Sequence, residues 1–236
     1  MSEPVIRRVR HLDARYAPRP WAWAEENADR IAAHWERRLT EQPRMFNGKV
    51  LLMRDLHFDE DTFRAAYFEV DFAAFLAFKE FGFPDPAIAN GFAMGALRAA
   101  DGAYVLGVMG PHTANRGRIY FPAGTPDRSD LTEDGRVDLA GSVLRELREE
   151  TGLGEGDVTV GEGWTIVRDG PTIAYMRPVA LAESAEAARD RIRGLIAAQP
   201  DPELADIVIV REPADIDEAR MPRFLLAYLR DALAQR

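Results

Sequence analysis

The sequence predicts an α/β protein in which helices enclose a sheet on two sides. Short apolar runs typical of strands recur between residues 93 and 210, and segments with helical apolar spacing lie at 139–151, 184–198 and 222–234. Strands enclosed by helices in this way form a three-layer α/β/α sandwich. With 236 residues, the chain is long enough for one large domain or for a standard domain with an N-terminal extension.

Residues 1–87 are expected to form an N-terminal α+β extension or subdomain that packs on the core. Residues 21–39 are predicted to be helical, because apolar side chains recur there at three- and four-residue intervals. Pro84-Asp85-Pro86 marks the end of this part. Its other expected elements are strands at 49–58 and 62–70 and a short helix at 72–78.

An aromatic stripe runs through the end of this extension, at Phe68, Phe72, Phe75 and Phe78. Such a stripe could line a substrate pocket. More often, aromatic residues at helical spacing belong to a hydrophobic core. The core is therefore the expected place of these four side chains.

Residues 88–236 are expected to form the main domain. It begins with a hairpin signal, two apolar runs around Asp101-Gly102. A loop over 111–117 then leads into a strand that ends at Pro122. The predicted elements are strands at 93–98, 104–109, 158–160, 164–167, 173–179 and 207–210, and helices at 139–151, 184–198 and 222–234.

Composition excludes several classes of function. The net charge of −9 argues against a general nucleic-acid binder or a protein of anionic membranes. The absence of cysteine excludes disulfides, thiolate zinc sites and a cysteine nucleophile. The basic start of the chain has no apolar stretch behind it, and no apolar run approaches the length of a membrane span. We therefore expect a cytoplasmic protein with neither nucleic acid nor membrane as its partner.

The most informative stretch of the chain is Arg145-Glu-Leu-Arg-Glu-Glu-Thr-Gly-Leu153. Within it, Glu146, Glu149 and Glu150 stand at i, i+3 and i+4 and so share one helical face. Most glutamate-rich faces are simply solvated. Carboxylates crowded in this way also suit a hard divalent cation such as Mg²⁺, with substrate phosphates and waters completing the shell.

These nine residues match R-E-U-x-E-E-x-G-U, where U is a bulky apolar residue, which is the second half of the Nudix box. Upstream, Tyr120-Phe-Pro-Ala-Gly124 is similar to the strand end and turn that precede this box. The chain thus resembles the Nudix hydrolase superfamily. The resemblance implies an α/β/α sandwich with a mixed sheet. It also implies hydrolysis of the diphosphate linkage in a nucleoside diphosphate derivative, with Mg²⁺ as the cofactor and Mn²⁺ as a possible substitute.

The resemblance also implies roles for individual residues. Glu149 and Glu150 are the first expected metal ligands and catalytic residues, and Glu146 is the third ligand. Arg145 is expected to brace the neighbouring loop through an ion pair. Gly124 is expected to let the backbone approach the site closely and to contact substrate. Helix 139–151 is expected to begin at Asp138, as its N-cap, and to end at Gly152.

The first half of the box departs from the pattern G-x5-E-x7-R-E. Counting back from Arg145 places Val137 where the glutamate should be, and the interval from Gly124 to Arg145 is about seven residues too long. Residues 125–136 therefore form an enlarged polar loop. The acids that could replace the glutamate are Asp127, Asp130, Glu133, Asp134 and Asp138.

Further residues outside the box are candidates for the site. Glu203 lies on a late loop before a strand, where some Nudix enzymes carry their general base, but it could equally be a surface acid. Arg116 and Arg118 precede the turn at Gly124 and could meet substrate phosphates, or they could be solvated.

The substrate is the least determined part. The N-terminal extension with a degenerate box is similar to the branch that cleaves nucleotide sugars, and the enlarged loop after Pro122 is similar to the coenzyme A diphosphatase branch. A nucleotide sugar or related small molecule is the first expectation, and coenzyme A or acyl-coenzyme A is the alternative. A non-catalytic, ligand-sensing or partner-binding domain is a further alternative, which Val137 favours. A homodimer is possible, as in many members of the family.

Overall fold

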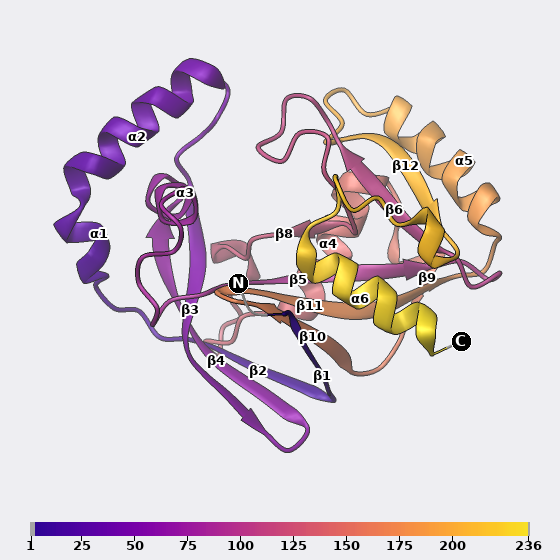
Figure 1. Cartoon of the computed structure of the whole chain (residues 1–236), viewed down its shortest axis with the longest axis horizontal. Helices are drawn as coiled ribbons and strands as arrows, with labels where there is room; N and C mark the ends of the chain where they lie inside the picture. Colours follow the sequence, from indigo (N-terminus) through magenta and orange to yellow (C-terminus); the bar gives the residue numbers. More distant parts are fainter. Residues whose placement is uncertain (1–2, 236) are drawn as a thin grey trace.

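The computed structural model describes residues 3–235 of the chain. Its larger part is a nine-stranded sheet (Figure 1). The main path follows the order β1-β10-β11-β5-β6-β12, and three short strands, β7, β8 and β9, pair alongside β6, β5 and β11. The strands are β1 (Val5–Val9), β5 (Asn90–Arg98), β6 (Tyr104–Met109), β7 (Ile119–Tyr120), β8 (Ala123–Gly124), β9 (Val158–Val160), β10 (Trp164–Asp169), β11 (Thr172–Leu181) and β12 (Leu204–Val210).

The sheet is mixed, as predicted. β11 and β5 run parallel, whereas β1 with β10, β10 with β11 and β12 with β6 run antiparallel. β5 and β6 form the expected hairpin, but they pair only at Arg98 and Tyr104 beside the turn. Away from the turn, β8 pairs with β5 and β7 pairs with β6. The chain from β7 to β8 therefore occupies the opening between β5 and β6.

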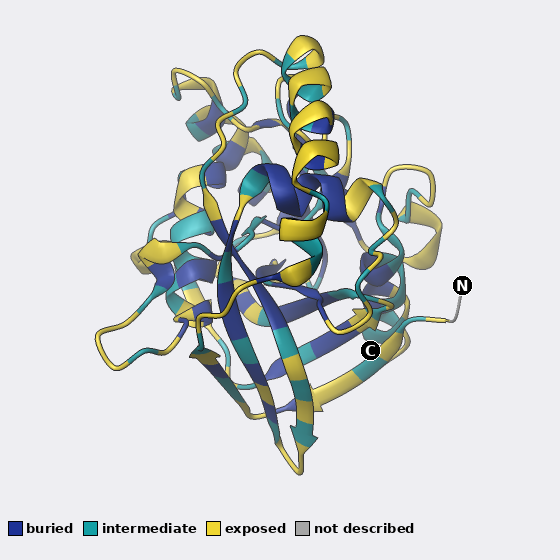
Figure 2. Cartoon of the chain, turned by 90° about the vertical axis from the view of Figure 1, so that its left-hand side faces the viewer, coloured by how far each residue is buried: buried dark blue, intermediate teal, exposed yellow. Residues whose placement is uncertain are grey.

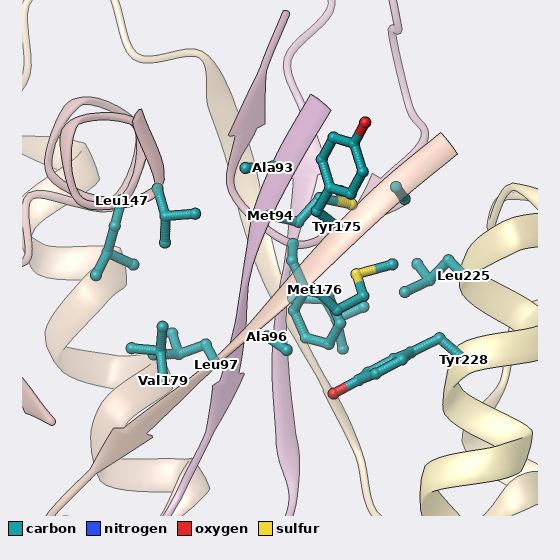
Figure 3. Packing of buried hydrophobic residues seen from close by; sticks show 14 of the residues in the cluster. Ala93, Met94, Ala96, Leu97, Leu147, Tyr175, Met176, Val179, Leu225 and Tyr228 are labelled. Atoms are coloured by element: carbon teal, nitrogen blue, oxygen red, sulfur yellow. The ribbon is translucent and has the colours of Figure 1, made fainter. Parts of the chain in front are cut away.

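Three helices cover the two faces of this sheet, α4 (Leu139–Thr151), α5 (Ala185–Ala197) and α6 (Arg223–Ala234). Leu147 of α4 packs with Leu97 and Val179 on one side of the strands, and Leu225 and Tyr228 of α6 lie on the other side (Figure 3). α5 contacts α4 and β12. The three-layer α/β/α sandwich is thus confirmed.

The N-terminal part adds a second, three-stranded sheet and three helices. In the sheet, β4 lies between β2, to which it is parallel, and β3, to which it is antiparallel. α3 is almost wholly buried, whereas the outer side of α2 faces solvent (Figure 2). The elements are β2 (His11–Tyr16), α1 (Ala22–Glu26), α2 (Ala28–Glu41), β3 (Lys49–Asp59), β4 (Thr62–Asp71) and α3 (Phe72–Glu80).

Two expectations for the N-terminal part were wrong. The predicted helix over 21–39 is two helices, because the backbone of Asn27 leaves the helical region and its side chain donates to the carbonyl of Trp23. Residues 5–16, for which no regular structure was predicted, form β1 and β2. β1 is an edge strand in which only Val9 is buried, so its arginine-rich sequence lacks the apolar alternation of a typical strand.

One apolar cluster extends across both parts, and a second one lies within the N-terminal part around Trp21 and α3. β1 extends the large sheet, and Met53 of β3 forms an isolated bridge with Ala89. The fully buried hydroxyl of Tyr67 in β4 donates to the hydroxyl of Tyr175 in β11 at 3.1 Å. The division at residue 87 stays a prediction, and these contacts cross it.

Tyr67→Phe is expected to lower the free energy of unfolding by about 1–2 kcal/mol, because it removes a buried hydrogen bond between the two parts and leaves the Tyr175 hydroxyl less well satisfied. Urea unfolding followed by circular dichroism measures this change. The control is Tyr16→Phe at a half-exposed position, expected to stay within about 0.5 kcal/mol of the parent. Equal effects of the two substitutions would contradict the prediction.

No helix within residues 3–235 is both long and apolar enough to cross a membrane.

Candidate active site

α4 carries the glutamates and is fixed at both ends. The Asp138 carboxylate accepts the backbone N–H of Gly141 at 2.9 Å, as expected of an N-cap. The helix ends at Gly152, whose φ of +76° lies in the left-handed region that favours glycine. Val143 and Leu147 face the sheet and are buried. Glu150 and Glu146 follow these residues at helical spacing and lie at the edge of the buried face, whereas Glu149 lies farther toward solvent.

The three glutamates differ in their exposure. Glu150 is buried, the side chain of Glu146 is 13% exposed, and that of Glu149 is 53% exposed. One carboxylate oxygen of Glu150, Oε1, accepts the backbone N–H of Ala123 in β8 at 3.1 Å. Its other oxygen, Oε2, is buried and has no hydrogen-bond partner among the described residues. A buried acceptor without a partner is costly unless a ligand satisfies it.

The charges of these carboxylates disturb one another. Burial raises the pKa of Glu150 well above its usual range, and the charges of Glu146, Glu203 and Glu149 raise it further, against the hydrogen bond from Ala123. Burial also raises the pKa of Glu146 to about 7, although Arg145 opposes this. Both carboxyls are therefore harder to ionise than an exposed glutamate, because ionisation would place buried negative charges close to one another.

Gly124 lies directly against this cluster. A Cβ added to Gly124 would overlap the carboxylate of Glu146. Glycine at this position leaves the space that the Glu146 side chain occupies, and its role toward a metal or substrate stays a prediction.

Arg145 braces the neighbouring loop, as expected. Its Nη2 donates to both carboxylate oxygens of Asp130 at 3.0 and 3.1 Å, and its Nη1 lies 2.7 Å from Glu146 Oε1 and 3.5 Å from Glu149 Oε2. The Asp130 side chain is only 3% exposed. Asp130 ends the short 3₁₀ helix Arg128–Asp130, and its Oδ2 also accepts the N–H of Asp127 at 2.9 Å.

Of the five acids proposed to replace the missing glutamate, the structure places Asp130 against Arg145. The others are used or located elsewhere: Asp127 caps the 3₁₀ helix, Asp134 pairs with Arg136, Asp138 caps α4, and Glu133 is exposed. Val137 does not stand in the place of the glutamate, because the extra residues lie after Asp130.

The spacing forward from Gly124 contained this signal. Gly124 and Asp130 obey G-x5-E with aspartate for glutamate, and fourteen residues instead of seven then separate Asp130 from Arg145. The seven residues 131–137 form a small hairpin closed by a bridge between Leu131 and Val137. The chain returns to its starting point, where the Asp138 N–H donates to the Asp130 carbonyl at 2.7 Å.

The hairpin 131–137 rests on the N-terminal sheet. The N–H of Tyr16 donates to the Gly135 carbonyl at 2.9 Å, and the N–H of Val137 donates to the Ala14 carbonyl at 3.0 Å. β2 thereby holds the loop that carries Asp130. The N-terminal part is connected to the site through this backbone pairing.

The structure also brings Glu203 to the glutamates. Its carbonyl accepts the N–H of Gly110 at 2.7 Å, which fixes the loop before β12. The Glu203 side chain is exposed, yet its charge raises the pKa of Glu146, Glu150 and the neighbouring Tyr120. The late-loop acid is therefore within electrostatic range of the site.

The fit of these residues to a divalent cation rests on the donor set. Within residues 3–235, no three acidic or histidine side chains form a ready-made ligand group, because Glu146 turns to Arg145 and Glu150 to Ala123. The unpartnered oxygen of Glu150 and the mutual repulsion of the carboxylates are nevertheless what a hard cation with oxygen ligands would relieve. The residues present thus fit Mg²⁺ or Mn²⁺.

A cavity of about 760 Å³ adjoins the site and lies between the two parts of the chain, a size typical of small-molecule sites. Ala123, Gly124 and Thr125 form the end nearest the glutamates. The other walls come from α3, β5, the loop before β7 and the start of α6.

The aromatic stripe divides between this cavity and the core. Phe72 and Phe75 line the cavity, whereas Phe68 and Phe78 are fully buried and pack around Trp21. Phe68, Phe75 and Phe78 thus belong to the core, as expected, and the use of the cavity as a substrate pocket stays a prediction.

Arg116 and Arg118, predicted to meet phosphates, also line the cavity. Arg118 Nη1 donates to the carbonyl of Ala219 at 3.3 Å. Besides Arg223 at the start of α6, the lining has a further basic residue that the sequence did not predict, Lys79 at the end of α3. The sequence carried no local signal for it, because the cavity forms only when the N-terminal part packs on the core.

Comparison of the sequence with family models and with curated proteins finds no match. Among solved structures, the chain is similar to a Nudix hydrolase from M. smegmatis, RenU, with 19% identity over 62% of this chain and 86% of that chain, at a TM-score of 0.41. It is also similar to the Bacillus subtilis pyrophosphohydrolase BsRppH, with 14% identity over 81% of this chain and 95% of that one, at 0.37. A third is the C. elegans Ap4A hydrolase, with 15% identity over 63% and 100%, also at 0.37.

At TM-scores below 0.5, these similarities do not by themselves assign a function.

Proposed function

We propose that this chain is a Nudix-type hydrolase that cleaves the phosphoric anhydride bond of a nucleoside diphosphate derivative with the help of Mg²⁺ or Mn²⁺. The observation that carries the proposal is the buried, unpartnered oxygen of Glu150 among crowded carboxylates, at the end of a cavity with basic walls. A site that had lost its catalytic function would gain nothing from this arrangement, because a buried acceptor without a hydrogen-bond partner destabilises the fold.

The glutamates of the site have separate roles in metal binding and proton transfer. Glu150 and Glu149, with Glu146 as the third ligand, would hold the cation. A bound divalent cation offsets phosphate charge and lowers the pKa of a water molecule. Glu203 would accept the proton of the attacking water, since its charge acts on the same cluster from the loop before β12. The expected products are a nucleoside monophosphate and a second phosphorylated compound.

The basic cavity residues would position the substrate. Arg116 and Arg118 would neutralise phosphate oxygens that the cation does not reach, and the Gly124 backbone would leave room for the diphosphate. Positioning and electrostatic stabilisation supply most of the acceleration in phosphoryl transfer. A nucleotide sugar and coenzyme A or its acyl derivatives remain the two candidate substrates predicted from the sequence.

The test is hydrolysis of a panel of nucleoside diphosphate derivatives in Mg²⁺, in Mn²⁺ and in EDTA, with added phosphatase to reveal monoester products. The panel contains UDP-glucose, ADP-ribose, coenzyme A, NADH and dinucleoside polyphosphates. Metal-dependent release from one or more of them is expected. If the folded protein hydrolysed none of these compounds with metal present, the proposal would be overturned. A ligand-sensing domain would then be favoured.

Gly124→Ala is expected to lower metal-dependent turnover about 10- to 100-fold, because the new Cβ displaces the Glu146 carboxylate and small misplacements at a reacting centre are costly. The free energy of unfolding should change by less than about 1 kcal/mol, since a flexible side-chain end can move aside. Gly156→Ala, with open space around its Cβ, is the matched control for both measurements. Full activity of Gly124→Ala would remove the close-approach role.

A further inference from the structure

One face of α3 lines the cavity beside the site. Phe72, Phe75, Leu76 and Lys79 stand at i, i+3, i+4 and i+7, which places their side chains on one side of a helix, and all four line the cavity. Other residues of α3, among them Phe78, are buried in the N-terminal core. The cavity face of α3 thus has an apolar beginning and a cationic end.

The cavity holds three basic side chains that no carboxylate neutralises. Within residues 3–235, none of Lys79, Arg116 and Arg118 forms an ion pair, although most other arginines of this acidic chain do. The two acids that line the cavity are already engaged. Asp169 lies 3.4 Å from Arg223, and Glu218 pairs with Arg230.

Lys79 lies near one carboxylate and two guanidinium groups. Lys79 is exposed, but the protein atoms around it reduce its hydration and lower its pKa; the charges of Arg118 and Arg38 lower the pKa further, and Glu80 opposes them. The Glu80 carboxylate is itself engaged, at 2.7 Å from His34 Nε2 and 3.4 Å from Arg38 Nε. An anion placed between Lys79 and Arg118 would relieve their repulsion.

The cavity has more basic side chains than are required to neutralise the scissile diphosphate. Under the proposed function, the cation held by the glutamates already offsets the diphosphate, and the arginines of the loop before β7 add to it. A substrate that ended in a neutral sugar would leave the exposed ammonium group of Lys79 with water as its partner and no anion. The apolar part of the α3 face suits an organic group between the two charged regions.

We propose that the α3 face is a subsite for a group joined to the scissile diphosphate, such as a ribose, and that this group carries a further phosphate monoester bound by Lys79, with the charge of Arg118 close by. The inference rests on the proposed function for the orientation of the substrate. It narrows the substrate class to phosphorylated nucleoside diphosphate derivatives, and it gives the N-terminal extension a part in recognition.

The chain offers a direct binding test, because Lys49 and Lys79 are its only lysines. The protein is labelled with an amine-reactive reagent in Ca²⁺, which replaces Mg²⁺ as a hard cation at the diphosphate, under conditions where the ligands stay intact, and each lysine is followed by mass spectrometry. Two ligand pairs are compared, NADPH with NADH and acetyl-coenzyme A with its 3′-dephospho form. Lys49, which lies 2.7 Å from Asp71 on the N-terminal sheet, is the internal control.

At least one phosphorylated ligand is expected to slow labelling of Lys79 at a concentration where its partner without the phosphate has little effect, with Lys49 unchanged. Lys79→Gln is expected to weaken binding of that phosphorylated ligand about tenfold, the loss expected for one charge-assisted hydrogen bond. Lys49→Gln should leave its affinity unchanged.

Equal protection by both members of each pair, or no protection of Lys79 by either phosphorylated ligand, would overturn the inference. Because labelling needs no turnover, the outcome is independent of the hydrolysis assay. Selective protection without hydrolysis would retain the subsite and reject the proposed function. Hydrolysis without selective protection of Lys79 would retain the proposed function and reject the subsite. Where turnover occurs, Lys79→Gln should also reduce the kcat/KM preference for the phosphorylated member about tenfold.

Discussion

Replacement of Glu150 by glutamine is expected to lower metal-dependent hydrolysis by about 10³-fold, since a catalytic cation supplies several kcal/mol and each 1.4 kcal/mol corresponds to a factor of ten. The protein should stay folded. The glutamine carbonyl can still accept the Ala123 N–H, and the substitution removes a buried charge. Steady-state kinetics at saturating Mg²⁺ measure the loss.

A thermal shift separates lost metal binding from lost chemistry. A ligand that binds only the folded state raises its stability, so added Mg²⁺ or Mn²⁺ should raise the Tm of the parent but not of Glu150→Gln. Glu155→Gln, at an exposed position just beyond α4, is the matched control and should behave as the parent. Parental turnover in Glu150→Gln would mean that the metal assignment is wrong.

Asp130→Ala is expected to lower the free energy of unfolding by about 2–3 kcal/mol. It removes the buried partner of Arg145 and leaves the guanidinium with its weaker contacts to Glu146 and Glu149, and breaking a buried ion pair costs more than the pair contributes. The same change releases the N–H of Asp127. Urea unfolding gives the magnitude.

The neighbouring Asp134 provides the comparison for this experiment. Its side chain is 62% exposed in the same loop and pairs with Arg136, so Asp134→Ala should cost less than about 1 kcal/mol. If both substitutions had the same small effect, Asp130 would not be the acid that supports Arg145.

The parts of the site that lie close together in the chain were predictable from the sequence. Asp138, Glu146, Glu149, Glu150 and Gly152 all lie on or beside α4, where spacing alone fixes which side chains share a face. The same holds for the strands and helices after residue 88, whose apolar periodicity is strong.

Features that depend on long-range contacts could not be predicted in this way. β1 and β2 are rich in charged residues, and they are strands because β10 and β4 supply their hydrogen-bond partners. Lys79 reaches the cavity only through the packing of α3 against the main domain. Asp130 was one of five candidates until the closure of residues 131–137 placed it beside Arg145.

The self-closing hairpin between Asp130 and Asp138 separates distance along the chain from distance in space. Because the polypeptide leaves and re-enters at one backbone hydrogen bond, the length of this insert has little bearing on where Asp130 and Arg145 meet. A sequence motif with fixed spacing matches the two sides of this insert separately and neither side completely. A motif written as a set of spatial neighbours keeps it whole, and insertions of other lengths at this point should be equally compatible with the same arrangement of side chains.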